Sequence, residues 1–121
     1  MDRFFFVSGA LAAFIAVALG AFGAHSLKDR LSPEMLNIFD VGVRYHMYHA
    51  LGLLAVAWAI ARWPEASLNA AGWAFIVGIV IFSGSLYILS IFDIRWLGAI
   101  TPLGGLAFLI GWAILVWSVA K

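Results

Sequence analysis

The chain has no cysteine and very little charge: only 11% of its 121 residues are charged. The absence of cysteine excludes disulfides, thiolate metal centres, iron–sulfur clusters and cysteine nucleophiles. An average soluble domain carries about 25% charged residues, so this low fraction is not typical of a soluble protein. Seven basic residues against six acidic ones give a net charge of +1, which excludes a basic surface for binding nucleic acid.

What the chain has in excess is apolar residues, which make up 65% of the sequence and give a mean hydropathy of +1.06. These values indicate an integral membrane protein, and the length allows a single transmembrane domain covering residues 1–121. A helix needs about 20 mostly apolar residues to cross the hydrocarbon core of a membrane. Charged residues divide the chain into four such stretches, which predict spans at about residues 4–24, 45–62, 69–91 and 97–119.

The first connection contains a helix start before the second span. Ser32 is a suitable N-cap, Pro33 suits the first helical position, and Glu34 lies near the positive end of the helix dipole. The stretch 33–44 is amphipathic, with Asp40 and Arg44 spaced to pair. The other connections are short, which favours antiparallel neighbours. We therefore predict an all-α fold: an integral membrane up-down four-helix bundle with an interfacial helical extension before the second span.

Small residues at every fourth position predict close packing between the helices. The first span carries them at Ala12, Ala16, Gly20 and Ala24. Lipid tails are as apolar as leucine, so no hydrophobic effect drives membrane helices together. They associate instead through close packing, which small residues permit. We expect this stripe to face another helix.

Polar residues of the four spans fall in one half of the predicted bundle. An up-down arrangement places the end of the first span, the start of the second, the end of the third and the start of the fourth in the same leaflet. Polar groups at membrane depth are costly unless they are paired or line a wet cavity. We therefore predict one polar cluster that binds a ligand or partner, formed by His25, Arg44, Tyr45, His46, His49, Ser83, Ser85, Tyr87 and Thr101.

Three histidines in this cluster raise the question of a metal. His46 and His49 are three residues apart on one helix, and His25 could approach from its neighbour. Imidazoles suit zinc, copper, iron or nickel. The alternative is that each histidine bonds a carbonyl, tyrosine, serine or aspartate. No cofactor is predicted, and a metal held by His25, His46 and His49 remains open.

Two further interpretations concern the charged and hydroxyl groups. Arg44, with Lys28 and Arg30 nearby, could hold an anionic lipid headgroup, or it could simply pair with Asp40. Ser83 and Ser85 could act as nucleophiles only with a base and an orienting carboxylate, and no carboxylate is placed to serve. Serine in membrane helices more often bonds its own backbone, so the sequence favours a non-enzymatic protein.

Several short motifs around these polar residues resemble a known family. They are Gly20-Ala-Phe-Gly-Ala-His25, Tyr45-His-Met-Tyr-His-Ala50, Phe82-Ser-Gly-Ser-Leu-Tyr87 and Thr101-Pro-Leu-Gly-Gly105, with Gly111-Trp112. In this order they resemble the domain-of-unknown-function 423 family of small bacterial membrane proteins, which has eukaryotic small transmembrane relatives. The resemblance covers nearly the whole chain. It implies four membrane helices in a bacterial cytoplasmic (inner) membrane, and it implies no activity.

Three functions are compatible with the sequence. The first is a membrane component that uses the polar cluster to bind lipid or a protein partner, which includes a second copy of the chain. The second is a histidine-based site for a metal or small ligand. The third is an accessory subunit of a membrane complex whose polar cluster only holds its own fold. Membrane lipids are the expected partners, and nucleic acid is not.

Overall fold

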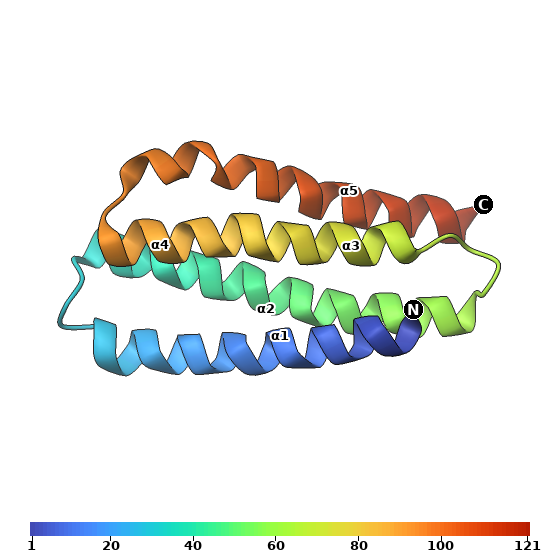
Figure 1. The fold of residues 1–121 in the computed structure, drawn as a ribbon, viewed down its shortest axis with the longest axis horizontal. Helices are drawn as coiled ribbons and strands as arrows, with labels where there is room; N and C mark the ends of the chain where they lie inside the picture. The colour runs from blue at the N-terminus through green and yellow to red at the C-terminus, as the bar shows by residue number, and fades with distance from the viewer.

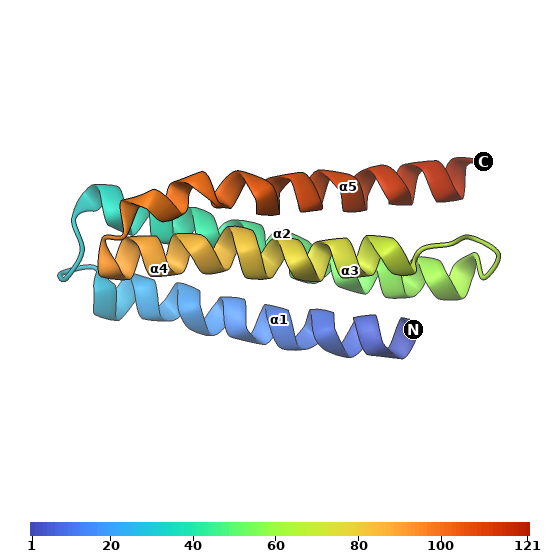
Figure 2. The same ribbon diagram turned by 45° about the horizontal axis from the view of Figure 1, so that its top comes forward.

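The computed structural model describes residues 1–121 as helices with short connections and contains no strand, so the all-helical class is confirmed. The helices lie side by side as long rods, with both termini at one end of the molecule (Figures 1 and 2). Four rods result, over residues 2–27, 33–62, 69–92 and 95–120, and the third is continuous and includes a π-helical turn. In chain order the elements are α1 (Asp2–Phe22), the π-helix η1 (Gly23–Leu27), α2 (Pro33–Arg62), α3 (Asn69–Gly78), the π-helix η2 (Ile79–Ser83), α4 (Gly84–Phe92), the 3-10 helix η3 (Arg95–Ala99) and α5 (Thr101–Ala120).

Three rods are long and apolar enough to cross a membrane: Asp2–Leu27, Asn69–Phe92 and Arg95–Ala120. They correspond to three of the predicted spans. The predicted span at 45–62 is the second half of the longer helix α2, which is not among the three. The two histidines and two tyrosines in the middle of α2 lower its hydropathy.

The predicted helix start at Ser32 is confirmed. The Ser32 hydroxyl accepts a hydrogen bond from the Met35 amide at 3.2 Å, and Pro33 occupies the first turn of α2. The amphipathic stretch that follows forms the opening turns of one 30-residue helix, so it runs directly into the second predicted span. Its apolar side is buried in the bundle, where the Phe39 ring lies 5.1 Å from the ring of Tyr87 in α4.

The charged side of this stretch is as expected. Arg44 pairs with Asp40 at 2.7 Å, and both side chains are more than half exposed.

Close packing of α1 against α2 is present, and the predicted stripe carries part of it, since a Cβ at Gly20 would lie 3.4 Å from the Val43 side chain of α2. Of the stripe only Ala16 is buried, and Ala24 is exposed. The tight positions are Gly9, where a Cβ would lie 2.8 Å from the Ala50 carbonyl oxygen, and Gly23, where it would meet the Phe39 ring. A four-residue step turns about 40° beyond a full helical revolution, so a long run of such steps rotates away from the partner helix.

The hydrophobic core joins all four rods. It contains Phe5 of α1, Leu53, Val56 and Ala57 of α2, Ala71 and Phe75 of α3, and Phe108 of α5. These residues lock the rods together around α2 and fix the positions of the polar side chains described next.

Candidate functional site

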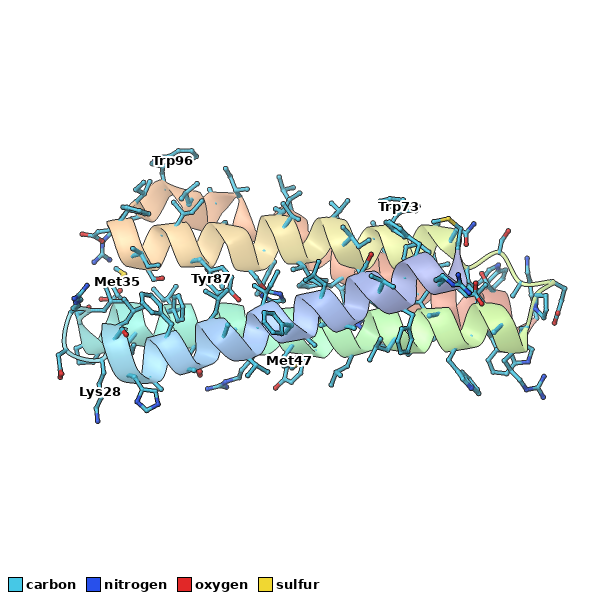
Figure 3. The ribbon with its side chains drawn as sticks, turned by 60° about the horizontal axis from the view of Figure 1, so that its bottom comes forward. Lys28, Met35, Met47, Trp73, Tyr87 and Trp96 are labelled. Carbon is cyan, nitrogen blue, oxygen red and sulfur yellow. The ribbon has the colours of Figure 1, made fainter.

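The polar centre of the molecule lies about halfway along α2. His46 and His49 are both buried, with residues 33–45 of the helix before them and residues 50–62 after them. Figure 3 shows Met47 near the middle of the bundle, whereas Lys28 and Met35 lie at one end. These histidines were expected near one face because the predicted span began at Tyr45. They lie at mid-height because the helix begins at Pro33.

His49 has a partner for each ring nitrogen. Its Nδ1 lies 2.8 Å from the backbone oxygen of Tyr45, and the indole Nε1–H of Trp112 donates to its Nε2 at 3.0 Å. A carbonyl only accepts and an indole N–H only donates, so the ring is neutral and carries its hydrogen on Nδ1. The imidazole also stacks on Phe108 of α5, with ring centroids 3.5 Å apart. His49 therefore joins α2 to α5.

His46 and the neighbouring backbone of α2 are joined to the third rod. The Nδ1 of His46 lies 2.8 Å from the hydroxyl of Tyr87 in α4. The fully buried Ser83, in η2, donates to the backbone oxygen of Gly42 at 2.7 Å. The π-helical turn of η2 ends at this serine, immediately before α4 begins.

Ser85 and Thr101 join the third rod to the fourth. Their hydroxyls lie 2.6 Å apart, and each also reaches a carbonyl of its own segment, Phe82 for Ser85 and Leu97 for Thr101. No buried side-chain nitrogen or oxygen in the molecule lacks a hydrogen-bond partner.

Most of the predicted cluster therefore makes contacts between rods. Tyr45 belongs to it through its ring, which packs on Phe82, and through its backbone oxygen, which holds His49. The predicted residues in these contacts are Tyr45, His46, His49, Ser83, Ser85, Tyr87 and Thr101.

Two predicted residues stand outside this network. His25 is exposed in η1, and Arg44 is exposed on α2 with Asp40 as its partner. The predicted set of His25, His46 and His49 is not formed, and no group of three or more His, Cys, Asp or Glu side chains could hold a metal. The reason is geometric: His46 turns to α4, His49 turns to α5, and His25 lies at the far end of the first rod.

Trp112 was not predicted as a member of the network, although it supplies the second hydrogen bond of His49. Tryptophan in a membrane protein is typical of the aromatic belt at the interfaces, and for this reason Trp112 was not considered as a hydrogen-bond partner. A chemical argument could have identified Trp112. A buried imidazole needs a hydrogen-bond partner at each nitrogen, and an indole N–H is a donor.

A cavity of about 550 Å³ lies outside the network, between η1 and the opening turns of α2. Its apolar lining includes Leu36, Phe39 and Val43. Lys28 and Asp40 line it as well, and both are exposed. Lys28 has no ion-pair partner, whereas Asp40 is held by Arg44. Lys28 lies at the end of the bundle formed by the first connection (Figure 3).

Comparison with known proteins gives one consistent result. A family model described as "Protein of unknown function (DUF423)" matches residues 19–105. The chain is 50% identical over 120 residues to the UPF0382 membrane protein YwdK of Bacillus subtilis, covering 98% of both chains. It is 48% identical over 119 residues to a UPF0382 membrane protein of Staphylococcus epidermidis, covering 98% of this chain and 97% of that one. No solved structure matches.

These relatives are bacterial and named as membrane proteins, and three rods of this chain have the length and composition of membrane spans. The chain is accordingly an integral protein of the bacterial cytoplasmic membrane.

Proposed function

Since the chain belongs to the DUF423 family, whose function is unknown, we propose that it crosses the membrane four times in alternating directions and binds a phospholipid at its first connection. The observation that carries the lipid proposal is the cavity beside Lys28. The proposal has two parts, the crossing of α2 and the occupant of the cavity, and each has its own support.

The crossing of α2 is supported by its packing. This helix lies alongside the other rods over its length and packs against α1, α3, η2 and α4 (Figure 1). Eleven of its 30 residues are buried, including both histidines. A polar side chain that is hydrogen-bonded inside a bundle does not meet lipid, so α2 can cross with a lower hydropathy than its neighbours. A helix of this length measures about 45 Å, more than a bilayer core needs.

The occupant is inferred from the chemistry of the cavity lining. Leu36 and Val43, both half-buried, offer apolar surface to an acyl chain, and the ammonium of Lys28 offers a charge to a phosphate. Asp40 adds one negative charge, and Arg44 neutralises it through a 2.7 Å ion pair. The balance at the cavity is therefore one positive charge from Lys28. The volume of about 550 Å³ is that of a small-molecule site.

The test is lipid retention in the gently extracted protein, measured by native mass spectrometry. Lys28→Gln should lose most of the bound phospholipid, and Ala24→Leu should lose it by filling the cavity, because Ala24 lines it. Arg30→Gln is the matched control, since Arg30 lies in the same connection but outside the lining. Equal retention in all three variants would refute the proposal. A bound protein in place of lipid would favour the partner-binding alternative.

A further inference from the structure

A different cavity, of about 490 Å³, lies between α2 and α5 beside His49. We call it the aromatic groove. Tyr45 and Tyr48 of α2 form one wall, to which Phe82 of η2 adds a further ring. Phe108 and Trp112 of α5 form the other wall, and Gly105 of the same helix also lines the groove. The Tyr45 ring lies 4.9 Å from Phe82 and 5.5 Å from Tyr48, so three aromatic rings are continuous along one side.

The polar side-chain atoms of the groove all have a hydrogen-bond partner except two tyrosine hydroxyls. Both nitrogens of His49 and the indole nitrogen of Trp112 are used in the hydrogen bonds already described. The hydroxyls of Tyr45 and Tyr48 have no partner in the protein, although Tyr45 uses its backbone oxygen to hold His49. The two tyrosines line the groove and are 40% and 54% exposed, so they lie at its open side.

The two hydroxyls lie at a depth in the bundle where a polar group without a hydrogen-bond partner is unusual. Tyr45 and Tyr48 flank Met47, which Figure 3 shows near the middle of the bundle. Because α2 crosses the membrane in the proposed function, the middle of the bundle lies in the hydrocarbon core of the bilayer. An unpaired hydroxyl there costs free energy that a ligand with an acceptor oxygen would recover. The inference rests on the crossing of α2 in the proposed function, and it does not depend on the lipid cavity at Lys28.

We propose that the aromatic groove binds a lipophilic ring compound that carries carbonyl oxygens, the chemistry of a membrane quinone. A flat ring packs against Phe82 and Trp112, and its carbonyl oxygens accept hydrogen bonds from Tyr45 and Tyr48. Its apolar tail lies in the lipid, onto which the groove opens. A Cβ at Gly105 would be in ordinary van der Waals contact with the Phe82 ring, at 3.8 Å, so a larger side chain at this position would extend into the groove.

The experiment uses the full-length protein in phosphatidylcholine nanodiscs, with a short-chain benzoquinone as the probe and tryptophan fluorescence as the readout. A quinone bound beside Trp112 quenches its emission and saturates, whereas collisional quenching rises linearly with quinone. We expect saturable quenching in the natural sequence. The double variant Tyr45→Phe with Tyr48→Phe should bind about tenfold more weakly, since two hydrogen bonds are lost.

Matched variants separate quinone binding in the groove from a loss of folding and from lipid binding at Lys28. Phenylalanine keeps the shape of tyrosine, and neither hydroxyl bonds the protein, so the double variant should melt at the natural temperature. Gly105→Leu should abolish saturation by filling the groove. Lys28→Gln should leave the quinone response unchanged even if it loses phospholipid. The phosphatidylcholine around the protein is itself an aliphatic diester that carries carbonyls without a ring, so saturation by the quinone in its presence shows a preference for the ring.

Two results would overturn the proposal: linear quenching in the natural sequence, or saturation that is equal in the natural sequence and the double tyrosine variant. Failure of α2 to cross the membrane is detected separately, by thiol labelling of its two ends. A linear response in a protein with four demonstrated crossings would therefore count against the quinone site alone.

Discussion

At the scale of single residues, the stability of this molecule depends on how a buried imidazole is satisfied. His49 is 4% exposed, and it obtains its two partners from the Tyr45 carbonyl of its own helix and from Trp112 of α5. Only the second bond crosses between rods. Loss of the indole N–H would leave Nε2 as a buried acceptor without a donor, which costs more than a missing bond at the surface.

We therefore predict that Trp112→Phe lowers the free energy of unfolding by about 1 kcal/mol, the scale of hydrogen bonds between membrane helices. The measurement is equilibrium unfolding in mixed micelles with a denaturing detergent. Trp117→Phe is the control, because Trp117 is on the same helix, is 70% exposed and makes no side-chain hydrogen bond. Combining His49→Phe with Trp112→Phe should cost less than the sum of the two single changes. Strict additivity would show that the bond carries no energy.

The polar residues also show how far a sequence can predict a site. That Tyr87, His46 and Ser83 converge follows from the topology, because polar groups in apolar spans must find one another. The individual pairs do not follow, since the indole of Trp112 and a backbone oxygen at Gly42 supply two of the partners. The three histidines do not come together in the structure, because helical spacing fixes which face a side chain occupies and not which neighbouring helix it meets.

At the scale of elements, the contact between α5 and η2 is the tightest in the bundle to involve backbone atoms. A Cβ at Gly104 would collide with the backbone nitrogen and Cα of Phe82. A backbone cannot move aside as a flexible side chain can, so the two rods would have to separate. At Gly84, two residues beyond Phe82 on the opposing rod, nothing lies within 4 Å of such a Cβ.

Gly104→Ala should therefore destabilise the protein by about 1–3 kcal/mol, the usual cost of overpacking. Gly84→Ala, the same chemical change in the same region, should be neutral or raise stability by up to about 1 kcal/mol, because alanine is the better helix former. Thermal melting of both variants in one detergent compares them directly. Equal melting temperatures would show that the α5–η2 contact is looser than described.

Element boundaries were predictable where local chemistry sets them. Ser32 with Pro33 marked the start of α2, because a hydroxyl cap and a missing N–H both suit a first turn. The π-helical turns η1 and η2 were not predictable, since an extra residue in a turn leaves no mark on residue periodicity.

At the scale of the whole molecule, the four rods and the charged connections set the arrangement in the membrane. Arg95 in the third connection pairs with Glu34 in the first turn of α2 at 3.3 Å, which ties the first and third connections at one end. The connection between Arg62 and Asn69 lies at the other end with both termini (Figure 1). Four crossings therefore require the first and third connections on one side of the membrane and the second on the other.

The absence of cysteine makes this arrangement directly testable, because a single introduced thiol is the only one to react. We predict that Asp29→Cys and Trp96→Cys react with an impermeant maleimide from the same side of sealed vesicles, and that Glu65→Cys reacts only from the opposite side. Leu51→Cys is the control: this residue is 53% exposed on α2 at mid-height, so the surrounding lipid should block its labelling until detergent is added. Labelling of Glu65→Cys from the same side as Asp29→Cys would mean that α2 does not cross. Such a result would also move Tyr45 and Tyr48 out of hydrocarbon and remove the reason for their hydroxyls to need a ligand.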